Sequence, residues 1–170
     1  SRPVYASRVY EGEAVAENRA FDLVNTIVVP HTFSSENDYT LTRTDVAADP
    51  LEPVHYFLDV PAGATRMNVT LSAPDGKYSY SCGELFDPAG RTYSYLGRLN
   101  TTQGVVERTG HVDERDLTPG VWELVVWGDY RAGKTSYHDV KVEFMGFEVL
   151  GAPALSVAFK PGKTPRGSFE

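Results

Sequence analysis

Two segments with alternating apolar and polar side chains constrain the fold of this chain more than any other feature. They are FLDVPAGATRMNVTLSAPDG, at 57–76, and LTPGVWELVVWGDY, at 117–130. In the first, Met67, Val69 and Leu71 alternate with polar neighbours, which is the pattern of a strand with one face on a core and the other towards water or a partner. Each segment also contains a turn built from Pro and Gly. The pattern predicts antiparallel β-structure.

Short strand patterns occur along most of the chain, and no segment has the periodicity of an amphipathic helix. Turn sequences at 75–76, 87–90 and 119–120 separate them. We therefore predict an all-β fold, a jelly-roll-like antiparallel β-sandwich of about 8–9 strands. The expected strands are 21–29, 39–46, 54–60, 64–71, 77–86, 91–99, a stretch near 105–109, 121–127 and 136–144.

The length of 170 residues is that of one domain with a core of its own. We expect residues 1–19 to form a linker or strand-free arm, residues 20–150 the β-sandwich, and residues 151–170 a linker or C-terminal extension. Residues 1–19 are polar with little periodicity, and residues 161–170 combine Pro, Gly and charge. Such flanks, together with Ser1 at the first position, are typical of a piece of a longer polypeptide.

Charge and hydropathy exclude some partners. The 16 Lys and Arg residues against 23 Asp and Glu residues give a formal charge of -7, without a basic cluster. Nucleic acid is therefore not an expected partner. The longest apolar run falls far short of the roughly 20 residues that a membrane span needs, so no membrane insertion is expected. No signal-peptide pattern opens the chain.

Residues that bind metals or act as nucleophiles are few and scattered. Cys82 is the only cysteine, which excludes an internal disulfide, and we expect it to pack as a small core-facing residue. The four histidines lie in separate segments and predict no zinc site. The acidic stretches 111–116 and 36–38 lack the pattern of a calcium loop. Motifs of hydrolases and phosphate-binding loops are absent, so we predict no catalytic residue, metal or cofactor. The histidines are His31, His55, His111 and His138.

Aromatic side chains are the remaining candidates for a binding site. Trp127, Tyr130, Tyr93 and Tyr95 suit a platform on which a sugar ring would stack. Aromatic residues also form the bulk of sandwich cores, and both interpretations remain open. Trp127 and Tyr130 lie beside a Gly-containing turn and are the pair that we expect to be most exposed.

The order of these motifs resembles a known family. The segment 57–76, followed by ELFDPAGR and then LTPGVWELVVWGDY, resembles the jelly-roll domains appended after the catalytic unit of subtilisin-like serine proteases. Upstream, FDLVNTIVVPH at 21–31 is similar to the strand that precedes this unit in large subtilases of the tripeptidyl peptidase II type. The resemblance covers roughly residues 20–147. The pre-peptidase C-terminal domains of bacterial secreted proteases share the same arrangement, and both subgroups remain open.

The resemblance implies a non-catalytic accessory domain that supports stability, assembly or contact with substrate or a surface. None of the subtilase triad surroundings occurs here, so no catalytic residue is carried over. The implied partners are the catalytic domain of the same polypeptide, a protein substrate or a cell-surface component. The implied location is extracellular or at the surface of a bacterial cell, although cytosolic tripeptidyl peptidases also exist. A carbohydrate-binding module and an independent hydrolase are the alternative functions.

Overall fold

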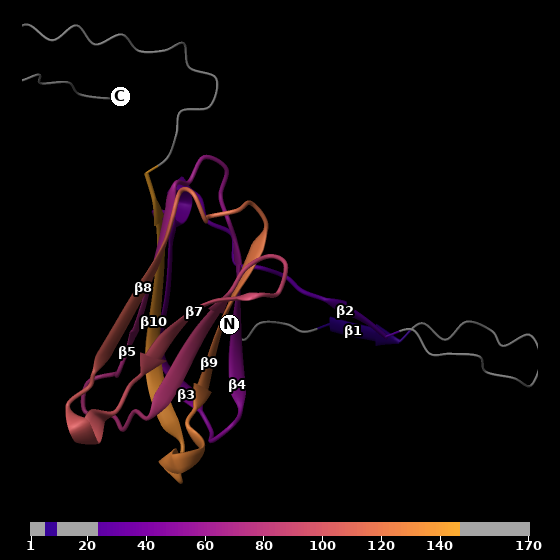
Figure 1. Ribbon diagram of the computed structural model, residues 1–170. Coiled ribbons are helices and arrows are strands. Elements are labelled where there is room, and N and C mark those ends of the chain that lie inside the picture. Colours follow the sequence, from indigo (N-terminus) through magenta and orange to yellow (C-terminus); the bar gives the residue numbers. More distant parts are fainter. Residues whose placement is uncertain (1–5, 10–23, 147–170) are drawn as a thin grey trace, which may run out of the picture.

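The computed structural model describes residues 6–9 and 24–146, which form strands and three single-turn 3-10 helices. Figure 1 shows most of the strands gathered in one sandwich. No helix of the described part is long and apolar enough to cross a membrane. The elements are β1 (Ala6–Val9), β2 (Val24–Ile27), η1 (Ser35–Asn37), β3 (Thr40–Ala48), β4 (Pro53–Asp59), β5 (Arg66–Ser72), β6 (Ser81–Phe86), β7 (Thr92–Arg98), η2 (Thr101–Gln103), β8 (Glu107–Asp113), β9 (Val121–Gly128), η3 (Tyr130–Ala132) and β10 (Ser136–Met145).

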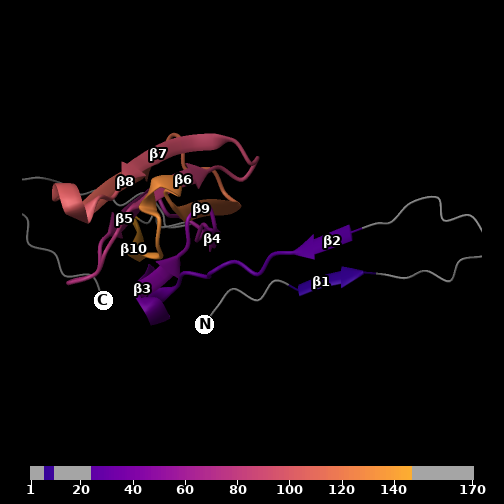
Figure 2. The same ribbon diagram turned by 90° about the horizontal axis from the view of Figure 1, so that it is seen from below.

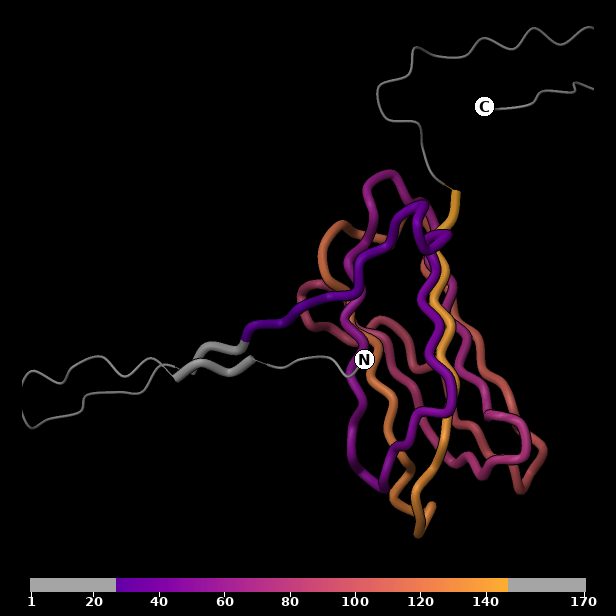
Figure 3. Tube along the Cα trace, turned by 180° about the vertical axis from the view of Figure 1, so that it is seen from behind, coloured from indigo at the N-terminus to yellow at the C-terminus, as the bar shows by residue number. Residues whose placement is uncertain are grey.

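Eight strands form two antiparallel four-stranded sheets, with the orders β3-β10-β5-β8 and β4-β9-β6-β7. Apart from the β6–β7 hairpin, every connection from β3 to β10 leads from one sheet to the other. Figure 3 shows the consequence at one edge, where β3 and β10 lie side by side although they are far apart in sequence. This strand order is that of a jelly roll. The predicted all-β sandwich is confirmed.

The alternation that predicts the strands places their apolar side chains in the shared core. Met67, Val69 and Leu71 of β5 are fully buried. On β9, Trp122 and Leu124 face the core from the other sheet and are also fully buried. Their neighbours along each strand point outwards and are exposed or half-buried, as the two-residue period requires. The core therefore follows directly from the sequence pattern.

The N-terminal strands differ from the prediction. The apolar stretch 21–29 contains β2, which pairs with β1 in a separate two-stranded sheet and not with the sandwich. This hairpin lies beside the sandwich in two views (Figures 1 and 2). β1 lies in a stretch for which no strand was expected. Residues 6–9 form a strand by pairing with β2, which is distant in sequence, and the short segment alone does not predict that pairing. The chain joins the sandwich at His31, whose N–H donates to the Phe57 carbonyl oxygen at 2.7 Å.

The β8 strand also differs, because it extends to Asp113 where the sequence predicts a strand only near 105–109. His111 and Asp113 are therefore strand residues on the outer side, with the fully buried Val112 between them. Residues 10–23 and 147–170 lie outside the described part. The domain boundaries expected at residues 19 and 150 consequently stay predictions.

Candidate functional site on the outer face of one sheet

The outer face of the β4-β9-β6-β7 sheet carries aromatic and aliphatic side chains among charged ones. The strand register sets them in rows, with Trp127 opposite Cys82 in one row and Val125 opposite Glu84 in the next. On β7, Arg98 continues the first row and Tyr95 the second. We call this surface the aromatic face and define it by Phe86, Tyr95, Val121, Val125 and Trp127.

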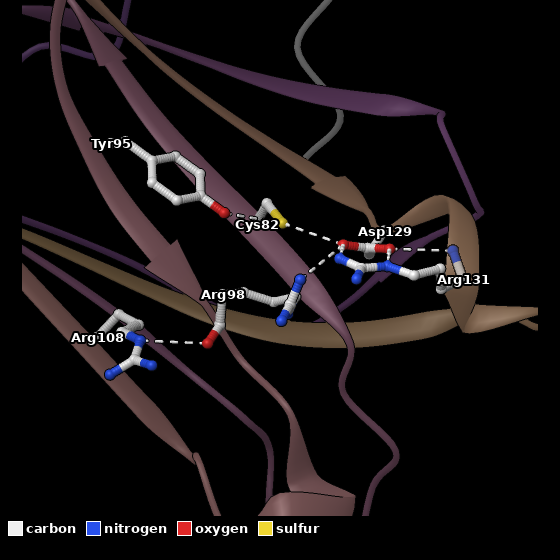
Figure 4. A network of polar contacts seen from close by, with 6 residues as sticks. All are labelled: Cys82, Tyr95, Arg98, Arg108, Asp129 and Arg131. Carbon is white, nitrogen blue, oxygen red and sulfur yellow. Dashed lines mark hydrogen bonds and ion pairs between the residues drawn. The ribbon is translucent and has the colours of Figure 1, made fainter.

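A buried carboxylate organises one end of the aromatic face. Asp129, which follows β9, is only 5% exposed. Its two oxygens accept hydrogen bonds from Nε and Nη2 of Arg131, both at 2.8 Å, while the backbone N–H of Arg131 donates at 3.0 Å. Arg98 reaches the same carboxylate from β7 at 3.4 Å (Figure 4). The hydrogen bonds from Arg131 hold the pKa of Asp129 well below its usual range.

The two guanidinium groups also lie over aromatic rings. The Cζ atom of Arg98 is 5.1 Å from the centre of the Tyr80 ring, and that of Arg131 is 5.8 Å from the same ring. Arg131 lies 5.0 Å from the centre of the Tyr130 ring as well. Cation–π contacts of this kind restrain both the charge and the ring. We call Arg98 and Arg131 the arginine pair.

Cys82 lies beneath this network. Its Sγ accepts a hydrogen bond from the Tyr95 hydroxyl at 3.3 Å and lies 3.8 Å from the nearer carboxylate oxygen of Asp129 (Figure 4). The residue is buried as predicted, but it points to the outer side of β6 and not to the core, because its neighbour Gly83 takes the inward position. Burial raises the pKa of the Cys82 thiol and raises that of Tyr95 to about 12. Both groups are therefore protonated at neutral pH.

The four aromatic residues predicted as a binding site do not form one platform. Trp127 is half-buried on β9, and Tyr130 is 67% exposed in η3. Tyr95 lies on the same face, with its hydroxyl directed to Cys82. Tyr93 lies apart from them, because its ring packs edge-on against Trp122 at 5.3 Å and its hydroxyl donates to Asp116 at 3.3 Å.

Sequence reasoning missed the charged residues of this site. The neighbouring letters DYR contain Asp129 and Arg131, and an acidic residue that ends a strand two positions before an arginine is a usable signal for a capped turn. Arg98 carries no such local signal. It meets Asp129 only because β7 and β9 both pair with β6.

Histidine and carboxylate side chains elsewhere have structural neighbours. Nδ1 of His55 lies 2.5 Å from Glu123, and His111 lies 3.5 Å from Asp113. Ser34 caps η1 by accepting a hydrogen bond from the Glu36 N–H, and the Asn37 side chain completes the capping box by accepting one from the Ser34 N–H. Within residues 6–9 and 24–146, no three His, Cys, Asp or Glu side chains gather in a way that would hold a metal ion.

A buried polar cluster lies between the sheets. The Oγ atoms of Ser81 and Ser136 are 2.7 Å apart, and Nε2 of His138 lies 2.9 Å from the Tyr56 hydroxyl. Ser136 and His138 are two residues apart on β10, and a serine and a histidine act together in the catalytic sites of many hydrolases. Both side chains are fully buried, so a substrate has no access to them. Their contacts join the two sheets.

Sequence similarity links part of this chain to a curated protein. No family model matches the chain. Pyrolysin from Pyrococcus furiosus is 31% identical over an alignment of 84 residues, and the match covers 45% of this chain and 6% of pyrolysin. The chain thus spans a small fraction of this relative.

The fold is shared with part of a larger solved structure. The structure of tripeptidyl peptidase 2 matches 84% of this chain with a TM-score of 0.55 and 16% identity, and the matched part is 13% of that chain. A second match, the Aeromonas sobria serine protease in complex with its chaperone, has a TM-score of 0.34, too low to compare folds. The resemblance predicted from the motifs is confirmed, and the similarity to pyrolysin associates this chain with subtilisin-like proteases.

Proposed function

We propose that this chain is a non-catalytic accessory β-sandwich domain of a subtilase-family serine protease. Its role would be to support stability, assembly or contact with a substrate or surface. The observation that carries the proposal is the similarity to a segment covering 6% of pyrolysin, in a chain whose eight sandwich strands follow jelly-roll order. A segment of this size fits one domain within a longer polypeptide, because domains have their own cores and occupy about 50–250 residues.

The chemistry of the described residues supports this proposal. The serine and histidine that are close in sequence on β10 are enclosed in the core, and Cys82 is a buried thiol with a raised pKa. The carboxylate with the strongest set of partners, Asp129, is neutralised by the arginine pair. These groups stabilise a fold, and none of them is placed to meet a substrate.

Deletion of residues 1–170 from the protease that contains them tests the proposal. We expect the shortened enzyme to lose activity faster on heating, or to change its oligomeric state, while its initial kcat/KM for a short peptide substrate changes little. The measurements are residual activity after heating and mass by light scattering. Equal stability, assembly and activity on protein substrates in both forms would refute the accessory role.

The carbohydrate-binding alternative is less well supported. A sugar platform needs coplanar rings, whereas Tyr93 packs on Trp122 and the Tyr95 hydroxyl is held by Cys82. Glycan-array binding by the chain that disappears in Trp127→Ala would favour this alternative instead.

For location, we propose the extracellular space or the cell surface. Fractionation of the native host, followed by immunodetection of the chain, tests this location.

A further inference from the structure

The two outer faces of the sandwich differ in chemistry. The outer face of the β3-β10-β5-β8 sheet is polar and charged, and its shallow depression is lined by side chains such as Arg66, Asn68, Thr70, Thr109, His111 and Glu143. On the opposite side of the molecule, the aromatic face has Val125 and Trp127 at outward positions of β9, whereas the outward positions of β5 are polar. Because β9 and β5 are both inner strands, this difference is not an effect of sheet edges.

The aromatic face remains partly open to solvent. Tyr95 is 55% exposed and Val121 is 37% exposed, while Phe86, Val125 and Trp127 are half-buried. Apolar side chains gathered on one face, here with Glu84 and Glu123 among them, fit a site that another surface covers. Aromatic residues and arginine are also the residue types enriched at the centres of protein interfaces.

The charges beside the apolar side chains identify the kind of partner. The arginine pair surrounds one buried carboxylate, so one end of the face keeps an excess positive charge. Glu84, on the central part of the same face, carries the opposite charge between Val125 and Tyr95. Charges of both signs close together fit a protein surface, whereas nucleic acid and anionic lipid require a uniformly basic face.

The contacts of the arginine pair also prepare it for binding. Arg131 is held by two hydrogen bonds to Asp129 and by the rings of Tyr80 and Tyr130, and yet its side chain is 46% exposed. The side chain of Arg98 is 34% exposed. A side chain that is already restrained loses little conformational entropy when a partner binds.

From these observations we infer that the aromatic face and the arginine pair dock another domain of the same polypeptide. That domain would present an apolar surface with a carboxylate opposite the arginine pair. The inference rests on the proposed function, since the matched segments are only 6% and 13% of the chains to which they belong. The inference specifies which of the two outer faces is covered and which kinds of side chain cover it.

Hydroxyl-radical footprinting with mass spectrometry tests the covered face directly. Oxidation rates are compared between the isolated chain of residues 1–170 and the longer polypeptide. We expect Trp127 and Tyr95 to be oxidised about fivefold more slowly in the longer polypeptide, because a covered core of an interface excludes water. His111, on the opposite outer face and 54% exposed in its side chain, is the control and should change by less than about twofold. Equal rates for Trp127 and Tyr95 in both forms would overturn the inference.

A matched pair of substitutions tests the same face by its effect on stability. Val125→Lys and Thr70→Lys place the same charge on the inner strands β9 and β5, at outward positions that are both half-buried. In the longer polypeptide, we expect Val125→Lys to accelerate heat inactivation about tenfold and Thr70→Lys to leave it nearly unchanged. Thermal unfolding of the isolated chain checks that both variants fold. Equal effects of the two substitutions would contradict the inference.

The charge of the partner is tested with Arg98→Met, which keeps an unbranched stem over the Tyr80 ring. Protection of Trp127 in the longer polypeptide should weaken in this variant and become less sensitive to salt. Protection and salt sensitivity that stay as in the unaltered chain would exclude a carboxylate opposite the arginine pair. Concentration-dependent dimerisation of residues 1–170 with protection of the same face would show a second copy as the occupant and overturn the inference.

Failure of this inference can be distinguished from failure of the proposed function. If deletion of residues 1–170 has no effect on the protease, the accessory role itself is wrong. If deletion lowers stability while the footprint of Trp127 and Tyr95 is unchanged, the accessory role stands and only the assignment of the face is wrong.

Discussion

At the scale of single residues, polar side chains are buried where they join distant strands. His138 is fully buried and bonds Tyr56 across the core, while Asp129 bonds two arginines at the surface of a sheet. Such groups stabilise the protein only while each keeps its partner and its charge state. Their substitution therefore has larger effects than substitution of exposed polar residues.

The stability of the chain should depend on pH through His138. Burial lowers its pKa from 6.5 to about 4, so the unfolded chain binds a proton between these values while the folded chain does not. The contribution of neutral His138 to the free energy of unfolding is therefore complete above pH 6.5. It is lost as the pH drops towards 4, by about 3 kcal/mol at most. Urea unfolding between pH 7 and 4 measures this loss. His138→Gln, which keeps a hydrogen-bonding group, should flatten the curve, and an unchanged slope would exclude His138 as its source.

Asp129→Asn should be strongly destabilising because it removes the charge that the arginine pair surrounds. We expect a loss of about 2–3 kcal/mol in the free energy of unfolding, since one partner of a buried pair is removed. Asp113→Asn is the matched control. Asp113 is 59% exposed in its side chain and pairs with Arg66 at 3.4 Å, and surface pairs contribute less than about 1 kcal/mol. Similar losses for both variants, measured by chemical unfolding, would contradict this view of Asp129.

At the scale of elements, close backbone approaches determine how strands end. Gly128 ends β9 where the chain before β4 crosses it, and the Leu51 N–H donates to the Gly128 carbonyl oxygen at 2.9 Å. A Cβ atom at this glycine would lie 2.7 Å from the Asp49 carbonyl oxygen. Within β7, Gly97 has a φ of 104°, which residues other than glycine rarely adopt, and a Cβ atom there would lie 3.0 Å from Nε of Arg108.

Gly128→Ala should therefore destabilise the end of β9 by more than the small size of the added methyl group suggests. The new methyl group meets backbone atoms, which move only if the strand ends separate, and overpacking of this kind costs about 1–3 kcal/mol. Gly76→Ala is the comparison, because its site is open and only its φ of 67° is unfavourable, at about 1 kcal/mol. Thermal unfolding measures both. A smaller loss for Gly128→Ala than for Gly76→Ala would be inconsistent with the close approach.

At the scale of the whole molecule, the two sheets depend on a single core. Neither sheet buries its inner side chains alone, because Val69 and Leu71 of one sheet and Leu124 of the other belong to the same cluster. The β3-to-β10 order also makes the chain pass between the sheets repeatedly. Unfolding of one sheet would expose the other.

We therefore expect the sandwich to unfold as one cooperative unit. Native-state hydrogen exchange should give the same opening free energy for the slowest amides of β9 and of β10, which are inner strands of different sheets. Leu124→Ala should lower both values together by about 2–5 kcal/mol. Exchange in which the amides of β10 keep their protection after this substitution would show that the sheets unfold independently.

What sequence alone predicts about this molecule is local. The alternation around Met67, Val69 and Leu71 determines strand type and inward face, and Pro and Gly determine the turns, because these are properties of neighbouring residues. Tertiary structure decided the rest. It paired β2 with β1, extended β8 to Asp113, and brought together Arg98 of β7, Cys82 of β6 and Asp129, which follows β9. Such contacts depend on strand order and register, which arise from burial of the common core. No single segment of the sequence predicts them.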